Sequence, residues 1–340
     1  MAQNPLASGK ITATGRCLAR LPKADLHLHL EGGMRSQTFA DLAESRGEPT
    51  PQLGYYRSFD QFQHCYRAIV KLIRTQTDLR RLVREVVEDA AASGAVWIEP
   101  HFNPTTYAPL LGSAEEVLDL VLETGFAAGK PLGVGFGLTL GASRNRDPRQ
   151  ATSLAQLAAA YAGRGVVAFG LTGDESANSP ATFKESFAIA RDADLIIAPH
   201  SGELSGPPSL ASTLDVLTPD RIAHGVRAIE DRALLDRLAD EQITLDVCLT
   251  SNYALGVVKH LEEHPLPHIL EAGVRCSLGS DDPLLLGTSL LTEYQLARSH
   301  LALPDAQLGA LASTSLRSSG APDDVLARAL RGIEDWMAEP

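Results

Sequence analysis

Short apolar segments alternate with helical segments along most of this chain, and this alternation most strongly restricts its fold. Near-continuous apolar strands separated by helices are typical of a parallel sheet that is covered on both faces. Eight such strands are predicted, at residues 24–29, 96–102, 134–140, 166–171, 195–200, 221–224, 243–248 and 274–278. The pattern predicts an α/β protein with a (β/α)8 barrel of the TIM type. A doubly wound open sheet is the alternative.

The chain is predicted to form a single domain over residues 1–340. Its length suits one barrel, and neither an internal repeat nor an obvious linker interrupts the alternation. Residues 1–20 are expected to be a loose leader. Residues 55–93 form a long helical stretch with no intervening strand, and apolar residues repeat at helical spacing from Leu79 to Val87. This stretch is predicted to be a helical insertion after the first strand.

Charge and composition argue against several classes of partner. The formal net charge is -12, whereas nucleic acids and anionic membranes are bound by clustered Lys and Arg. The N-terminus lacks the apolar core of a signal peptide, and no apolar run approaches the roughly 20 residues of a membrane span. The four cysteines lie far apart without a CxxC pair. We therefore expect a cytoplasmic protein that acts on a small molecule, with no nucleic-acid or membrane partner and with its oligomeric state left open.

The first predicted strand contains two histidines at alternate positions. His27 and His29 point to the same face of a strand, about 7 Å apart along it. Two imidazoles directed at one point supply half of a metal site. Two buried, hydrogen-bonded histidines are the alternative, so the remaining ligands must come from elsewhere in the chain.

Polar residues collect at the C-terminal ends of the predicted strands, where barrel active sites lie. Buried ionisable groups are costly unless they are paired or bound to a metal, so packing alone does not explain this distribution. Six of the eight strand ends carry such residues: His27 and His29, Gly173-Asp174-Glu175, His200 with Glu203, His224-Gly225, Ser251-Asn252, and Ser280-Asp281-Asp282-Pro283.

The chemistry of these groups suggests their roles. Three imidazoles and one carboxylate suit one divalent metal ion, most simply Zn²⁺, with a position left for water; the four ligands would be His27, His29, His200 and Asp281. The fourth strand contains no lysine that could be carboxylated to bridge two metals, which favours a single ion per chain. Glu203 is the candidate general acid/base, and His224 and Asp282 are candidates to orient and deprotonate the attacking water.

Taken together, these motifs resemble those of the adenosine deaminase family within the amidohydrolase superfamily. They occur in the family's order and extend from Pro22 to about Pro283. The matching segments are Pro22-Lys23-Ala24-Asp25-Leu26-His27-Leu28-His29-Leu30-Glu31-Gly32, Gly173-Asp174-Glu175, His200-Ser201-Gly202-Glu203, Arg221-Ile222-Ala223-His224-Gly225, Ser251-Asn252 and Ser280-Asp281-Asp282-Pro283.

The resemblance implies hydrolytic deamination of a 6-aminopurine nucleoside to the 6-oxopurine and ammonia. In this family the residues matching His27, His29, His200 and Asp281 hold zinc. The glutamate matching Glu203 passes a proton to N1 of the purine, and Gly173 offers a backbone contact to the ring. The residues matching His224 and Asp282 position the hydroxide that attacks C6. The HxE and PCxxC pattern of zinc cytidine deaminases does not occur in this chain.

Some departures from the family bear on the substrate. Glu31 occupies the position where adenosine deaminases proper carry an Asp that meets the ribose 5′-hydroxyl. We therefore predict that Glu31 binds the substrate, and that the 5′ end of this substrate is not a plain hydroxyl. One such substrate is 6-aminodeoxyfutalosine, an intermediate of a bacterial menaquinone route, which carries a carboxylate on its 5′ extension. Arg144 and Arg146 follow the third predicted strand and are predicted to pair with that carboxylate. A solvated loop without such contacts is the alternative.

Other functions compete with this one. Plain adenosine or deoxyadenosine deamination and adenine deamination remain alternatives within the family; adenine deaminases also tend to carry Glu at the position of Glu31 but to lose the Gly-Asp-Glu motif, which this chain keeps. A mononuclear barrel hydrolase acting on another amidine or amide is a further enzyme class. A non-catalytic binding protein on the same scaffold is the third, although such a protein would normally lose a ligand or Glu203.

Overall fold

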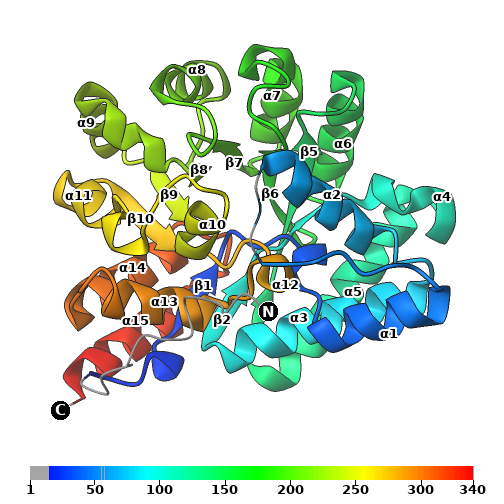
Figure 1. Ribbon diagram of the computed structural model, residues 1–340, viewed down its shortest axis with the longest axis horizontal. Helices are drawn as coiled ribbons and strands as arrows, with labels where there is room; N and C mark the ends of the chain where they lie inside the picture. The colour runs from blue at the N-terminus through cyan, green and yellow to red at the C-terminus, as the bar shows by residue number, and fades with distance from the viewer. Residues whose placement is uncertain (1–14, 55, 57, 340) are drawn as a thin grey trace.

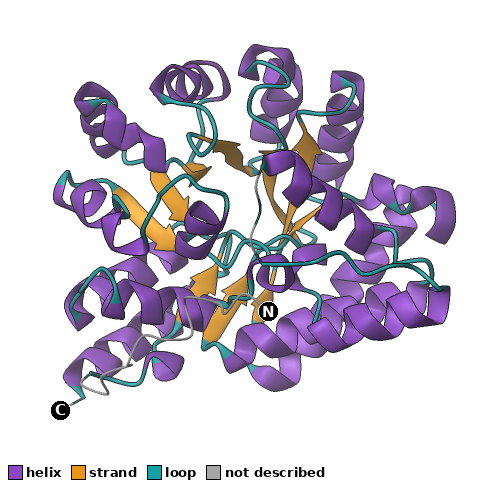
Figure 2. Cartoon of the chain, viewed as in Figure 1, coloured by secondary structure: helices purple, strands orange, loops and turns teal. Residues whose placement is uncertain are grey.

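The structure, a computed structural model, describes residues 15–54, 56 and 58–339. Short parallel strands lie at the centre of this part of the chain, and helices surround them (Figures 1 and 2). The strands are β1 (Lys23–Asp25), β2 (Ala95–Ile98), β3 (His101–Phe102), β4 (Gly135–Phe136), β5 (Leu138–Ser143), β6 (Val166–Thr172), β7 (Ile196–Ser201), β8 (Arg221–His224), β9 (Thr244–Val247) and β10 (Arg275–Leu278).

The strands form a ring in chain order, as a (β/α)8 barrel requires. One sheet has the order β1-β2-β4 and the other the order β10-β9-β8-β7-β6-β5-β3. Two parallel pairings join the first segment to both neighbours: Leu28 pairs with Asp281, and His29 with His101. The N–H of Asp281 donates to the carbonyl of His27 at 2.7 Å, and the N–H of His101 to that of Leu28 at 2.7 Å. The predicted barrel is confirmed.

Two of the eight predicted strands contain a break. The segment expected at 96–102 divides into β2 and β3 around Glu99 and Pro100, because proline has no N–H to donate to a sheet. The segment expected at 134–140 divides into β4 and β5 at Gly137, where a Cβ would lie 2.9 Å from the side chains of Trp97 and Val167. The first strand is also shorter than expected, since His27 and His29 lie beyond β1.

Most helices form the outer layer of the barrel. In chain order they are α1 (Ser36–Arg46), α2 (Phe59–Val70), α3 (Gln76–Ala92), α4 (Ala108–Leu111), α5 (Ala114–Leu132), α6 (Pro148–Ala160), α7 (Lys184–Asp192), α8 (Pro207–Leu217), α9 (Arg232–Asp240), α10 (Leu249–Ala254), α11 (Leu266–Glu271), α12 (Pro283–Leu286), α13 (Leu290–Ser299), α14 (Asp305–Arg317) and α15 (Asp323–Ala338).

The helical stretch predicted at residues 55–93 holds α2 and α3, which have different positions. α3 packs against α5 and β2 in the outer layer, through the buried apolar face that runs from Leu79 to Val87. A capping box of Thr75 and Asp78 fixes its N-terminus. α2 contacts instead the 3₁₀ turn Glu31–Gly33 and α12, near the C-terminal ends of the strands. It therefore lies beside the expected active site.

Residues 1–14 of the expected loose leader lie outside the described residues. The six that follow are packed against the C-terminal helices. Arg16 forms an ion pair with Asp305 at 3.2 Å, the carbonyl of Cys17 accepts from the indole N–H of Trp336 at 2.9 Å, and Leu18 is buried.

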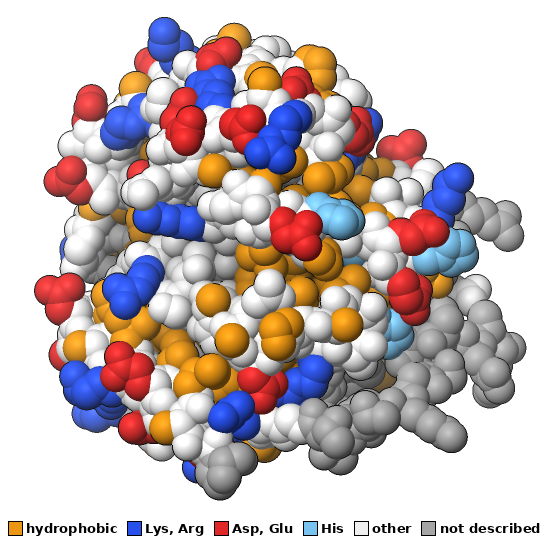
Figure 3. All heavy atoms as spheres, turned by 90° about the vertical axis from the view of Figure 1, so that its left-hand side faces the viewer, with side chains coloured by type: hydrophobic (Ala, Val, Ile, Leu, Met, Phe, Trp, Pro, Cys, Tyr) orange, Lys and Arg blue, Asp and Glu red, His pale blue; other side chains and the backbone are white. Residues whose placement is uncertain are grey.

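The described part of the chain contains no helix long and apolar enough to cross a membrane. On the face shown in Figure 3, acidic and basic side chains are interspersed rather than gathered by sign.

Candidate active site

The four predicted ligands converge at the C-terminal end of the barrel. His27 and His29 follow β1, His200 lies in β7, and Asp281 follows β10. The Nε2 atom of His200 lies 3.2 Å from the Nε2 atoms of both His27 and His29. One carboxylate oxygen of Asp281 lies 3.6 Å from Nε2 of His27 and 3.4 Å from Nε2 of His29. Three nitrogens and one oxygen thus surround one point.

This cluster fits a tetrahedral metal ion. Ligand nitrogens around a zinc ion are about 3.3 Å apart when each metal–nitrogen bond is about 2.0–2.1 Å, which is close to the distances here. The Nδ1 atom of His27 faces the carbonyl oxygen of Asp246 at 2.9 Å, so it must carry a proton and leave a lone pair on Nε2. Burial lowers the pKa of His29 to about 4 and that of His200 well below its usual value, so both rings are neutral, as ligands must be.

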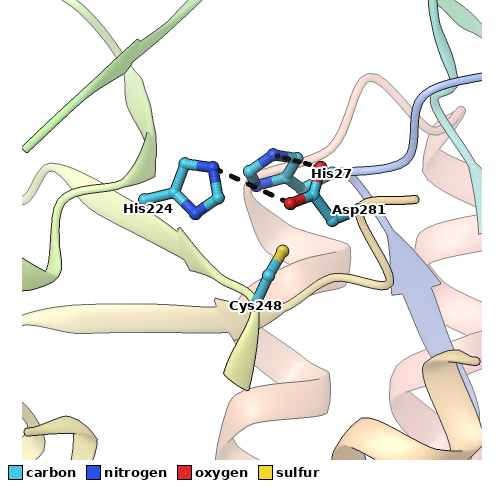
Figure 4. Close-up of side chains that lie close together, drawn as sticks. All are labelled: His27, His224, Cys248 and Asp281. Carbon is cyan, nitrogen blue, oxygen red and sulfur yellow. Dashed lines mark ion pairs between the residues drawn. The ribbon is translucent and has the colours of Figure 1, made fainter. Parts of the chain in front are cut away.

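Cys248 and His224 lie next to the same cluster. Figure 4 shows the side chains of His27, His224 and Asp281 directed toward one another, with the Cys248 sulfur pointing at the group. Burial raises the pKa of the Cys248 thiol well above its ordinary value, which leaves it protonated and a poor ligand. His224 and Asp281 adopt left-handed backbone conformations, with φ of 68° and 56°. Such strain in non-glycine residues is concentrated at functional sites.

Glu203 lies beside this cluster and is held by a backbone clamp. The carboxylate of Glu175 accepts the N–H groups of Gly202, Glu203 and Leu204 at 2.7–2.8 Å, which fixes the loop after β7. One Glu203 oxygen lies 3.4 Å from Nε2 of His224. Burial, and then the negative charges of Asp281 and Glu175, raise the pKa of Glu203 well above its ordinary value. Glu203 therefore keeps a proton that it can donate.

A cavity of about 370 Å³ opens above these groups. Most of the predicted site residues line it, namely Glu31, His29, Arg146, Gly173, His200, Glu203, His224, Asp281 and Asp282. Phe59 and Phe62 of α2 form part of its wall. Its volume is within the range of small-molecule sites.

Arg144 does not reach this cavity, and the prediction that it binds substrate is wrong. Its side chain is fully buried, and its guanidinium donates to the carbonyls of Asn178 at 2.9 Å and His200 at 3.0 Å. The amide of Asn178 in turn donates to the carbonyl of Arg144 at 2.7 Å. Arg144 thus supports the end of β7 from behind, whereas Arg146 lies exposed at the cavity rim.

Truncating Arg144 should therefore destabilise the fold. We expect Arg144→Ala to lower the free energy of unfolding by about 3 kcal/mol, because the buried carbonyl of His200 and the half-buried carbonyl of Asn178 lose their donor. Arg149→Ala is the matched control, since the Arg149 side chain is 91% exposed and should cost less than about 0.5 kcal/mol. Urea unfolding of both variants measures the difference, and equal stabilities would contradict the buried role of Arg144.

Glu31, Gly173 and Asp282 occupy constrained positions on the cavity wall. The Glu31 carboxylate accepts the hydroxyls of Tyr66 at 3.0 Å and Tyr107 at 2.9 Å, and burial raises its pKa. Gly173 has φ of 94°, which favours glycine, and a Cβ there would lie 2.3 Å from the side-chain oxygen of Asn145. Asp282 is buried, and its Oδ1 has no hydrogen-bond partner among the described residues.

Two residues of this cavity wall and one behind it were not predicted from the sequence. His101 lines the cavity, with its ring centroid 5.2 Å from that of His29 and 5.3 Å from that of His200. The sequence did contain a signal for His101, which is the penultimate residue of the second predicted strand, much as His200 ends the fifth. Tyr66 lines the cavity and Tyr107 lies behind Glu31; both come from segments that carried no motif.

A (β/α)8 barrel with three histidines and one aspartate arranged to fit a metal ion, next to a buried carboxylic acid, is typical of metal-dependent hydrolases. The sequence profile of the family described as adenosine deaminase matches residues 22–336. The chain belongs to this family. It is accordingly a hydrolase of the deaminase type that acts on a C–N bond of a purine.

Similar proteins agree with that assignment. A Streptomyces virginiae protein described as "Putative adenosine/adenine deaminase" is 45% identical over 337 residues, which cover 95% of this chain and 98% of the relative. The adenine deaminase of Sinorhizobium medicae is 34% identical, with coverage of 93% and 99%. Among solved structures, the adenine deaminase of Arthrobacter aurescens has a TM-score of 0.86 at 30% identity, covering 94% of this chain and 99% of that one. Arabidopsis ADAL complexed with IMP has a TM-score of 0.84 at 26% identity, covering 94% and 97%.

Proposed function

We propose that this protein is a hydrolytic 6-aminopurine deaminase with one zinc ion per chain, held by His27, His29, His200 and Asp281. The observation that carries the proposal is the convergence of these four side chains next to Glu203, a buried acid whose pKa is raised by burial. A donor set dominated by imidazole favours zinc over magnesium or calcium. When bound, the ion supplies a water molecule whose pKa is lowered towards neutrality.

The side chains around the cavity account for the remaining steps. Glu203 donates its proton to N1 of the purine, which makes C6 more open to attack by water. Asp282 and His224 orient that water, and the N–H of Gly173 contacts the ring edge. Water adds at C6, and the C6–N bond breaks to release ammonia and the 6-oxopurine. The buried walls exclude other water from the reacting atoms.

For the rest of the substrate, two basic side chains at the cavity rim support an anionic substituent. Arg67 of α2 and Arg146 both line the opening, are exposed, and make no ion pair with another described residue. Two free guanidinium groups suit a carboxylate or phosphate. We therefore propose a 5′-modified nucleoside such as 6-aminodeoxyfutalosine. The complex of Arabidopsis ADAL with IMP, a 6-oxopurine carrying a phosphate, supports an anionic group in a related cavity.

Free adenine is the second candidate. It is favoured by the names of the relatives, several of which are adenine deaminases at 32–34% identity. It is also consistent with Glu31, whose two oxygens already accept one tyrosine hydroxyl each. An N–H of the free base would then be the remaining donor to Glu31.

A substrate panel distinguishes these candidates. The kcat/KM values of adenine, adenosine, deoxyadenosine, AMP and 6-aminodeoxyfutalosine should be compared for the native protein, Arg67→Ala, Arg146→Ala and the control Arg149→Ala. We expect loss of Arg146 to lower kcat/KM about tenfold for anionic substrates and to leave adenine and adenosine unchanged. A native preference for adenine, with no effect of either cavity-rim substitution, would reject the anionic substrate and support adenine.

A further inference from the structure

A chain of hydrogen bonds leads from the backbone to His224 through two residues that have no role so far, His264 and Asn252. It begins at the N–H of Leu266, which lies 3.1 Å from Nδ1 of His264. A backbone N–H only donates, so this Nδ1 accepts and carries no proton. His264 is buried, and burial lowers its pKa to about 3, so the ring is neutral. The one ring proton of His264 therefore lies on Nε2.

The next bond fixes the amide of Asn252. Nε2 of His264 lies 3.0 Å from the side-chain oxygen of Asn252, which accepts its proton. Asn252 is fully buried in α10, and its own carbonyl accepts the N–H of Val258 at 3.1 Å. With the oxygen turned toward His264, the amide nitrogen of Asn252 faces Nδ1 of His224 at 3.5 Å. An amide NH₂ donates, so Nδ1 of His224 is the acceptor.

The other side of His224 is compatible with the same arrangement. Its Nε2 faces an oxygen of the Glu203 carboxyl group at 3.4 Å and one of Asp281 at 4.0 Å. A carboxyl oxygen of Glu203 can accept from an N–H at this position. The proton on Nε2 therefore follows from the direction of the hydrogen bond at Nδ1.

We propose that Asn252 and His264 are positioning residues that hold His224 in its Nε2–H form. The inference builds on the proposed function, because it assigns His224 a defined part in that reaction. In this form His224 offers an N–H to the oxygen of the attacking water and does not take its proton. His224 thus orients the water, without the deprotonating part of the role expected from the sequence.

The nearly isosteric change Asn252→Asp tests the relay. A carboxylate accepts from Nε2 of His264 but has no N–H for His224, so it should draw the His224 proton onto Nδ1. We expect kcat to fall about 100-fold while KM changes less than about threefold. The direct readout is the ¹⁵N spectrum of protein labelled at histidine. His224 should show a protonated Nε2 in the native protein and a protonated Nδ1 in the variant.

A matched pair at His264 separates positioning from packing. The amide nitrogen of Gln can replace Nε2 as a donor to Asn252, whereas Leu fills the space without a donor. We expect His264→Gln to retain at least about one third of the native kcat, and His264→Leu to lose about 30-fold or more. Both should show similar thermal midpoints.

Equal kcat in the two His264 variants, or an unchanged His224 spectrum in Asn252→Asp, would overturn the relay. The spectrum needs no substrate. If the native protein deaminated no 6-aminopurine but His224 still showed the expected Nε2–H signature, the proposed function would fail and the relay would stand.

Discussion

Replacing Glu203 with glutamine is expected to lower kcat by about 10²–10⁴-fold while the fold and the bound metal are retained. The amide has nearly the same shape as the acid but has no acidic proton to give to N1 of the purine. Glu203 is held by the Glu175 clamp through backbone groups, which the substitution does not touch. Steady-state rates from the absorbance change of the purine measure the loss of kcat. Metal analysis and circular dichroism check that the metal and the fold are retained.

The pH dependence of the native enzyme's activity should report the titration of Glu203. Burial raises the pKa of Glu203, and the reaction uses its protonated form. Activity is therefore expected to be present below the folded-state pKa of Glu203 and to fall as pH rises through it; Glu203→Gln should lack this limb. Glu185→Gln, an exposed acid on α7, is the control and should keep the native rate. Retention of more than about a tenth of the native kcat by Glu203→Gln would remove Glu203 from the acid role.

Substituting His200 should have the second large effect, because it removes the imidazole that contacts both other histidines. We expect His200→Ala to contain less than about 0.1 equivalent of metal after purification and to lose at least about 10³-fold in kcat. Metal binding stabilises only the folded state, so the native protein should also melt at a lower temperature after treatment with a chelator. The His200→Ala variant should show no such shift.

Two histidines serve as controls for His200. His268 is 71% exposed, and His268→Gln should keep metal and activity. His101 lies within 5.3 Å of His200 by ring centroids but is outside the convergent ligand set, so His101→Gln should keep the metal. Loss of metal in His101→Gln would extend the ligand set to a fifth residue, and full metal content in His200→Ala would contradict the assigned site.

The parts predicted from sequence are those that depend on strand ends. His27, His200 and Asp281 are far apart in the chain, yet each lies near or just after the C-terminal end of a predicted strand, and a parallel barrel brings such ends together. The barrel itself followed from the alternation of apolar and helical segments. Breaks at Pro100 and Gly137 were missed because runs of apolar residues conceal local irregularities in pairing.

The parts that could not be predicted depend on single contacts between distant segments. Arg144 has the same charge and loop position as Arg146, but its partners are carbonyls 34 and 56 residues away, which no side-chain pattern records. Likewise, nothing in the sequence pairs His264 with Asn252 or Glu175 with three backbone N–H groups. The burial of a charged side chain and the direction of its hydrogen bonds depend on its surroundings in the fold. The roles of Arg144, His264 and Glu175 therefore became visible only in the structure.

One zinc ion per chain is required if this site deaminates a 6-aminopurine by hydrolysis. The most direct measurement titrates metal-depleted protein with Zn²⁺ and follows 6-oxopurine and ammonia formed from the substrate panel. We expect the two products to appear in equal amounts and activity to reach its plateau at one zinc per chain. Stoichiometric zinc binding with no turnover of any 6-aminopurine, or turnover that does not depend on metal, would contradict it.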